Sequence, residues 1–210
     1  MALAALGHFG LYLALAFGAR MVLHLRRTGS AGFKGISGRP GSAEWTGGVL
    51  FAVALGLGLA APVLDLLEIM EPVTFLGRLP FRVLGLAMFA LGLAGTLIAQ
   101  VAMGDSWRIG VDESEKTELV TAGPFAVVRN PIFAAMIPTS LGLALLVPNV
   151  VALAAFLVLL AALELQVRLV EEAYLMRTHG EHYLVYASRV GRFVPGVGKV
   201  KTRSEPSWPS

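Results

Sequence analysis

Residues 131–163, "PIFAAMIPTSLGLALLVPNVVALAAFLVLLAAL", form an uncharged run of 33 residues that decides the fold class. A transmembrane helix needs about 20 residues at a rise of roughly 1.5 Å per residue, so this run is too long for one span. Pro148 and Asn149 stand in its middle, where proline interrupts a helix. The sequence therefore predicts a tight helical hairpin, and its second helix must continue to about Glu172 in order to cross the bilayer.

Three further apolar runs lie upstream of the hairpin. Trp45–Leu64 and Val83–Met103 contain no charged residue, and Ala2–Ala19 is interrupted only by His8. The 210 residues are 56% hydrophobic and 15% charged, which is typical of a membrane protein. Met1–Gly7 lacks the positive charge of a cleaved signal peptide, so we expect the first helix to be retained. The sequence predicts an all-α, polytopic integral membrane protein with about five transmembrane helices.

Basic residues lie mainly at one end of the predicted spans, and only Arg78 and Arg82 lie at the other end. By the positive-inside rule, the amino terminus is outside, and the 104–130 loop and the carboxy terminus are cytoplasmic, in the cell membrane. A net charge of +3 fits anionic lipid headgroups rather than nucleic-acid binding. With no cysteine, the chain has no disulfide or thiolate chemistry. The cytoplasmic basic residues are Arg20, Arg26, Arg27, Lys34, Arg39, Arg108, Lys116, Arg129, Arg168, Arg177, Arg189, Arg192, Lys199, Lys201 and Arg203.

The first cytoplasmic polar stretch, residues 104–131, is longer than a simple connection requires. It ends in Asn130 and Pro131, which together form a helix-start signal. The asparagine side chain can cap free backbone amides, and proline is favoured at the first helical position. Arg129 is then either a charge that only sets the topology or a functional residue.

The second polar stretch, residues 164–196, begins where the apolar run ends. Glu164, Arg168, Glu171 and Glu172 recur at helical spacing, so we expect them on one face of a helix that leaves the bilayer. Such a face either lines a polar cavity or is a solvated surface with weak ion pairs. The residues alone indicate a membrane protein with a cytoplasmic polar pocket.

Further along this stretch, two histidines and a glycine follow the glutamates. His179 and His182 lie three residues apart, but no third ligand completes a metal motif, so we expect a surface helix and no metal site. Gly180 is expected to interrupt that helix between Glu172 and Tyr183.

Several short motifs occur in a fixed order over residues 100–196. The chain here resembles the isoprenylcysteine carboxyl methyltransferases, integral-membrane enzymes that are themselves similar to phospholipid N-methyltransferases. The family pattern is a Gly-Pro-aromatic step, Arg-His-Pro-x-Tyr at a helix start, a helical hairpin, a Glu-Glu pair, Tyr-x-x-Tyr and Arg-Phe-x-Pro. The matching residues are Gly123-Pro124-Phe125, Arg129-Asn130-Pro131-Ile132-Phe133, Glu171-Glu172, Tyr183 with Tyr186, and Arg192-Phe193-Val194-Pro195.

The resemblance implies S-adenosylmethionine as the methyl donor and a lipophilic or membrane-embedded acceptor at the cytoplasmic face. It implies three regions: 1–103 with three transmembrane helices and no recognised motif, a catalytic region at 104–196, and a flexible tail at 197–210. One glutamate of the pair would bind the cofactor, and the arginines would orient an anionic group. The implied catalytic residues are Arg129, Asn130 and Arg192, and the implied cofactor-binding residues are Gly123, Pro124, Asn130, Glu171, Glu172 and Tyr183.

Two departures from the family pattern leave the acceptor open. Asn130 replaces a histidine and cannot titrate near neutrality, and Phe133 replaces a tyrosine and lacks the hydroxyl. An NADPH-dependent membrane sterol or enone reductase is an alternative, because those proteins have a similar carboxy-terminal helical arrangement. A non-catalytic lipid-binding membrane protein is another. The oligomeric state is also open.

Overall fold

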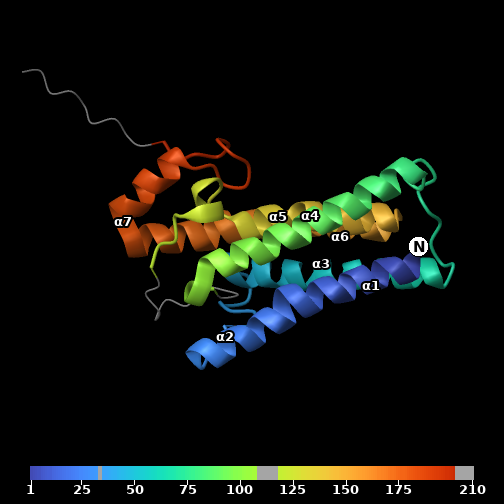
Figure 1. Ribbon diagram of the computed structural model, residues 1–210, viewed down its shortest axis with the longest axis horizontal. Coiled ribbons are helices and arrows are strands. Elements are labelled where there is room, and N and C mark those ends of the chain that lie inside the picture. The colour runs from blue at the N-terminus through green and yellow to red at the C-terminus, as the bar shows by residue number, and fades with distance from the viewer. Residues whose placement is uncertain (33–34, 108–117, 202–210) are drawn as a thin grey trace, which may run out of the picture.

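The computed structural model describes residues 1–32, 35–107 and 118–201, and its regular secondary structure within these ranges is helical. The helices run lengthwise in a bundle, with the amino terminus at one end and α7 at the other (Figure 1). Residues 108–117 of the predicted loop and 202–210 of the predicted tail lie outside the described ranges. The elements are α1 (Ala2–Tyr12), η1 (Leu13–Ala19), α2 (Arg20–Thr28), α3 (Ala43–Leu66), α4 (Leu79–Met103), η2 (Gly104–Ser106), η3 (Gly123–Ala126), α5 (Pro131–Leu146), α6 (Val150–Leu165), η4 (Gln166–Glu171) and α7 (Glu172–Arg189).

Four of the continuous helices in the described part are long and apolar enough to cross a membrane: Ala2–Thr28, Ala43–Leu66, Leu79–Ser106 and Val150–Arg189. Helix α5 is also apolar, but its 16 residues are fewer than a full span requires. Pro131 sets its start, and the turn before α6 sets its end. The all-helical, polytopic fold predicted from the sequence is confirmed. The fifth predicted helix is present, but it falls short of bilayer length.

The predicted hairpin turn is present between α5 and α6, and Asn149 holds it in place. Its side-chain oxygen accepts the backbone N–H of Ala152 at 2.9 Å, which caps α6, and its amide donates to the Ala61 carbonyl at 3.0 Å. Asn149 is fully buried. The preceding carbonyl, of Pro148, accepts the N–H of Val73 at 2.6 Å. The turn is therefore tied to α3 and to the α3–α4 loop.

Helix α4 packs most extensively on α5, and α3 packs on α6. The α4–α5 contact depends on small residues: a Cβ added to Gly142 would lie 2.5 Å from the Gly85 carbonyl and 2.7 Å from the Phe89 nitrogen. Close backbone approach of this kind is the usual basis of helix association in membranes. Tyr12, Phe89 and other apolar residues fill the space between the pairs; with them in the main core cluster are Ala16, Ala54, Met136, Leu159 and Leu163.

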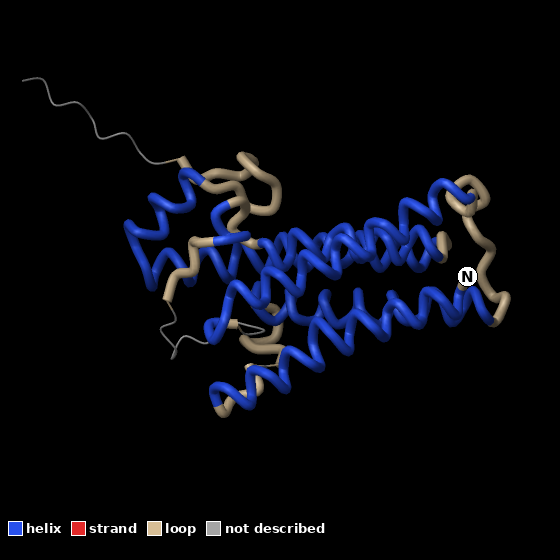
Figure 2. The backbone as a smooth tube through the Cα atoms, in the orientation of Figure 1, coloured by secondary structure: helices blue, strands red, loops and turns tan. Residues whose placement is uncertain are grey.

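Loops gather at the two ends of the bundle (Figure 2). The start of α3, the end of α4, the start of α5 and the end of α6 meet at the end away from the amino terminus. There Gly180 interrupts α7 with φ 51° and ψ −122°, a backbone conformation that L side chains rarely adopt. The second half of α7 thus turns back over this end, as the sequence predicted for Gly180.

Candidate active site

A cavity of about 380 Å³ lies where these helix ends meet. Its lining comes from both halves of the chain, including α3, α4, the start of α5, η4 and α7. Of the residues implied by the resemblance, Arg129, Asn130, Glu171 and Tyr183 line it. Gly123, Pro124, Glu172 and Arg192 are not among its lining residues. The structure thus brings part of the implied set together around one space.

Arg129 and Arg192 both bind Glu172 and form an ion cluster beside the cavity. Arg129 Nη2 lies 2.5 Å from Glu172 Oε1, and Arg192 donates from Nε at 2.8 Å and from Nη2 at 2.7 Å. The bidentate geometry is the strong form of a guanidinium–carboxylate pair. The Glu172 carboxylate raises the pKa of Arg192 above its ordinary value through these hydrogen bonds. Both carboxylate oxygens of Glu172 are therefore bound by arginine side chains of the protein.

Arg129 is 5% exposed and also satisfies backbone carbonyls of the carboxy-terminal segment. Its Nη1 donates to the carbonyls of Ala187 at 3.0 Å and Val190 at 2.6 Å, and its Nη2 donates to Gly198 at 3.0 Å. The backbone N–H of Arg129 bonds the Gly191 carbonyl at 2.8 Å. Arg129 thus fastens the segment after α7 to the start of α5, and its terminal nitrogens are engaged within the protein.

Asn130 occupies the predicted N-cap position of α5, but its side chain does not cap the helix. Its amide donates to the Arg192 carbonyl at 3.4 Å, and its backbone N–H bonds the same carbonyl at 3.1 Å. The capping role expected for the side chain is wrong: the side-chain amide is turned toward the segment around Arg192, and its oxygen accepts no hydrogen bond from the first turn of α5. Pro131 does begin the helix as predicted.

The charged face predicted for residues 164–172 is divided in the structure. Glu164 and Arg168 form an exposed ion pair with each other. Glu171 lines the cavity, and Glu172 faces the two arginines. The expectation of one shared face is wrong because Gln166–Glu171 adopts a π-helix, whose wider turn changes which residues share a face.

Tyr183 and Tyr186 lie on the returning half of α7, and both line the cavity. Tyr183 is 1% exposed, and its ring contacts that of Tyr186 edge-on at a centroid distance of 6.3 Å. The Tyr186 hydroxyl donates to the Phe125 carbonyl in η3 at 2.6 Å. Gly123 and Pro124 begin η3, and the next residue, Phe125, lines the cavity.

The first half of the chain supplies lining residues that the motifs did not indicate. Glu44, in the first turn of α3, is one of them, and it accepts a hydrogen bond from the Ser37 hydroxyl. Ser37 also lines the cavity. The sequence did contain a signal for Glu44: it is a single carboxylate directly before the uncharged run Trp45–Leu64.

Trp107, just after α4, is another such residue, 3% exposed and held by the first helix. The Arg20 guanidinium lies 5.2 Å from the centre of the Trp107 ring and donates to the Gly104 carbonyl. The His24 ring meets Trp107 edge-on at 5.6 Å. Both Arg20 and His24 are buried. These contacts attach the first helix to one wall of the cavity.

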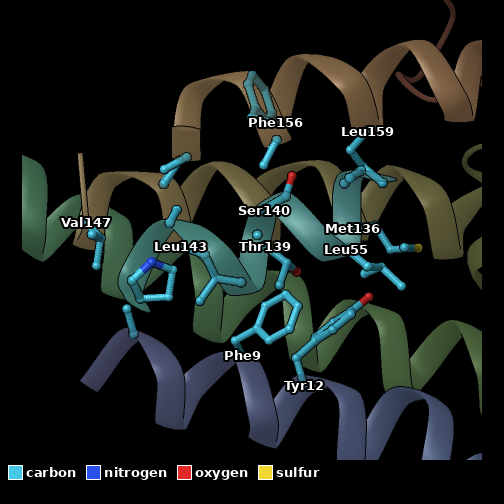
Figure 3. A pocket seen from close by; sticks show the side chains of 18 residues that line it. Phe9, Tyr12, Leu55, Met136, Thr139, Ser140, Leu143, Val147, Phe156 and Leu159 are labelled. Carbon is cyan, nitrogen blue, oxygen red and sulfur yellow. The ribbon is translucent and has the colours of Figure 1, made fainter. Parts of the chain in front are cut away.

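A second, smaller cavity of about 70 Å³ lies among α1, α3, α5 and α6 (Figure 3). Tyr12, Leu55 and Met136 line both cavities, so the two spaces adjoin. The smaller cavity extends from there toward the end of the bundle that holds the amino terminus, where Ala5 and Val147 line it.

The family model described as phospholipid methyltransferase (PEMT) matches residues 81–182. This match confirms the resemblance found in the motifs. A solved structure of a eukaryotic intramembrane Ras methyltransferase, isoprenylcysteine carboxyl methyltransferase (ICMT), has the same fold: the TM-score is 0.58 at 19% identity, over 94% of this chain and 69% of that chain. A comparison with curated proteins finds no match. The matched segment contains Arg129, Asn130, Glu171 and Glu172 and ends before Tyr183 and Arg192.

Proposed function

We propose that the protein is an S-adenosylmethionine-dependent methyltransferase that acts on the amine headgroup of a membrane lipid at the cytoplasmic face. The charge of the larger cavity carries this proposal. Among its described lining residues, Glu44, Glu118 and Glu171 are acidic and only Arg129 is basic. Three carboxylates against one guanidinium give this described lining an excess of negative charge, which favours cationic ligands.

S-adenosylmethionine suits such a cavity because its ammonium and sulfonium groups outweigh its single carboxylate, which leaves it with a net positive charge. A volume of about 380 Å³ falls within the roughly 300 to 1,000 Å³ usual for small-molecule and cofactor sites. We assign Glu171 to the ammonium group or the ribose hydroxyls, and Asn130 and Tyr183 to the adjoining wall. Arg129, Glu172 and Arg192 would instead hold the carboxy-terminal segment over the bound cofactor.

The reductase alternative fits the same residues less well. NADPH carries several phosphate groups, which proteins bind with arginine forks, lysines or helix N-termini. The sole basic residue among the described lining is Arg129, whose terminal nitrogens already have partners. The charge of the described lining therefore supports a sulfonium donor over a phosphorylated dinucleotide.

The same reasoning favours an amine over a carboxylate as the methyl acceptor. A carboxylate entering a cavity lined by Glu44 and Glu171 would be repelled, whereas an ammonium headgroup would be attracted. Glu44 comes from the other half of the chain and is the residue we assign to the acceptor headgroup. The description of the matching family, phospholipid methyltransferase, agrees with an acceptor of this kind.

Methyl transfer needs orientation more than a protein nucleophile. Bound S-adenosylmethionine supplies a methyl group made electrophilic by its sulfonium sulfur. The acceptor ammonium must first lose a proton, which Glu44 can accept, so that the nitrogen lone pair is free to attack. Aligning the two reactants at about 3 to 3.5 Å can supply much of the rate, and enclosing walls such as Trp107 and Tyr183 exclude water.

The experiment that tests this proposal offers purified protein in vesicles a deuterated methyl donor together with two acceptors. One is phosphatidylethanolamine, and the other is a farnesylcysteine analogue with a free carboxylate. We expect label only in the phospholipid, and Glu44→Gln to reduce that labelling by at least about tenfold while donor binding is retained. Label in the carboxylate acceptor alone would overturn the amine assignment, and label in neither would count against the enzyme.

A further inference from the structure

The smaller cavity lies between the helices of the bundle and is partly open at its edge. Phe9 and Tyr12 from α1, Leu55 from α3, and Met136 and Leu143 from α5 face it (Figure 3). Its end near the amino terminus is lined by small side chains, among them Ala61, Ala144 and Ala152, each of which is buried. The main core cluster of the protein thus surrounds a space that its own side chains leave open.

The hydroxyl groups at this cavity are already bonded. Thr139 donates to the Ala135 carbonyl at 2.8 Å, and Ser140 donates to the Ile137 carbonyl at 3.0 Å, each within α5. The Tyr12 hydroxyl lies 3.4 Å from Thr96 Oγ1. A site without free polar partners does not hold ordered water, and apolar cavities of this type bind apolar ligands. The lining of the smaller cavity therefore favours a hydrocarbon ligand.

The size of the space limits what can enter. Its 70 Å³ is about half of the roughly 150 Å³ of an apolar cavity that binds benzene, so on the order of three chain carbons fit. A whole lipid does not. Because Tyr12, Leu55 and Met136 also line the larger cavity, a chain whose headgroup is bound there has a direct way in.

We propose that this space receives the distal carbons of one hydrocarbon chain of the acceptor and so sets the chain length that the protein prefers; this rests on the proposed function. The headgroup binds at the charged end beside Glu44, and the chain passes Tyr12, Leu55 and Met136. A chain that reaches the space fills it and gains dispersion contacts with its walls, whereas a shorter chain leaves the space empty.

Filling the space should change chain-length preference without removing the headgroup site. Ala155→Leu adds three carbons to a buried wall of the space, and Ala54→Leu adds them from α3. We expect either variant to lower the ratio of kcat/KM for dipalmitoyl over dilauroyl phosphatidylethanolamine by about tenfold, since filling an empty cavity of about 70 Å³ is worth roughly that factor. Ala161→Leu, the same change at an exposed position of α6, is the matched control and should leave the ratio unchanged. An unchanged ratio in both pocket variants would overturn the proposal.

A second measurement does not depend on turnover. Phosphatidylethanolamine with a diazirine at the end of one chain is photolysed in vesicles that contain the protein. We expect cross-links in peptides from α1, α5 and α6 that line the space, and their loss in Ala155→Leu but not in Ala161→Leu. Cross-links confined to lipid-facing residues such as Leu157 would overturn the chain site. If the cross-links appear as expected but no methyl transfer is found, the proposed function fails while the chain site stands.

Discussion

Glu171 and Glu172 are neighbours in sequence with different surroundings. Glu171 lines the larger cavity, whereas Glu172 is bound by Arg129 and Arg192. The sequence motif names both residues but does not separate them. In the structure, the π-helix that ends at Glu171 determines which of the two faces the cavity. We therefore assign ligand binding to Glu171 and fold maintenance to Glu172.

Glu171→Gln should weaken the binding of S-adenosylhomocysteine, the demethylated product, by about tenfold to a hundredfold. A hydrogen bond to a charged group contributes roughly 1.5 to 3 kcal/mol, and the amide retains the shape but loses the charge. Isothermal titration calorimetry in detergent measures the change. Glu164→Gln, which removes one partner of an exposed pair on the same continuous helix, is the control and should cost at most about fivefold. Equal effects of the two variants would contradict the assignment.

Glu172→Gln should act on stability before it acts on binding. Removing this carboxylate leaves the buried guanidinium of Arg129 without its counter-charge, and breaking a buried pair from one side costs about 3 to 5 kcal/mol. We expect a clearly lower thermal unfolding midpoint, together with faster proteolysis after α7, where Arg129 holds the Gly198 carbonyl. A variant with unaltered stability that had lost cofactor affinity would instead make Glu172 a ligand.

At the scale of elements, the helices were predictable and their faces were not. Uncharged runs located the spans, and Pro148 with Asn149 located the hairpin, because bilayer length and proline chemistry are local properties of the sequence. The division of residues 164–172 into three environments depends on a π-turn, which the residue pattern does not indicate. Asn130 shows the same limit: its helix position was predicted, but its side-chain partner lies 62 residues further along the chain.

The first helix is an element of the site, although it lies outside the segment that the family model matches. Arg20 and His24 hold Trp107, and Trp107 forms part of the cavity wall. Motif reasoning treated residues 1–103 as carrying no functional signal. Their contribution arises from packing between segments far apart in sequence, which a single sequence does not reveal.

Arg20→Met should loosen Trp107 while the helices remain folded. A cation over an indole ring contributes about 0.5 to 2 kcal/mol, so we expect a red shift of Trp107 fluorescence and a fewfold loss of S-adenosylhomocysteine affinity. The fluorescence is read in a Trp45→Phe, Trp208→Phe background. Arg27→Met removes an arginine of the same helix that forms an exposed pair with Asp105, and it should change neither signal. Unshifted emission in the Arg20 variant would show that Arg20 does not hold Trp107 in place.

At the scale of the whole molecule, a larger cavity that contains the acidic side chains lies at one end of the bundle and adjoins the smaller apolar cavity. Under the proposed function, this arrangement would let a water-soluble donor and a membrane lipid reach one reaction centre from different sides. The orientation of the bundle follows from the distribution of basic residues and stays a prediction.

Single cysteines test this orientation, since the chain has none of its own. Glu71→Cys, in the loop between α3 and α4, should react with a membrane-impermeant thiol reagent added outside spheroplasts. Glu181→Cys, in the returning half of α7, should react only after lysis. Both positions are exposed. Labelling of Glu181→Cys from outside would show that the predicted orientation is inverted.

The central claim is that the acid-lined cavity binds a sulfonium methyl donor rather than a phosphorylated dinucleotide. Calorimetry of the purified protein with S-adenosylmethionine, S-adenosylhomocysteine and NADPH tests it most directly. We predict that both sulfur compounds bind, that NADPH produces no heat of binding, and that Glu171→Gln weakens the former. Binding of NADPH with no response to either sulfur compound would contradict the account.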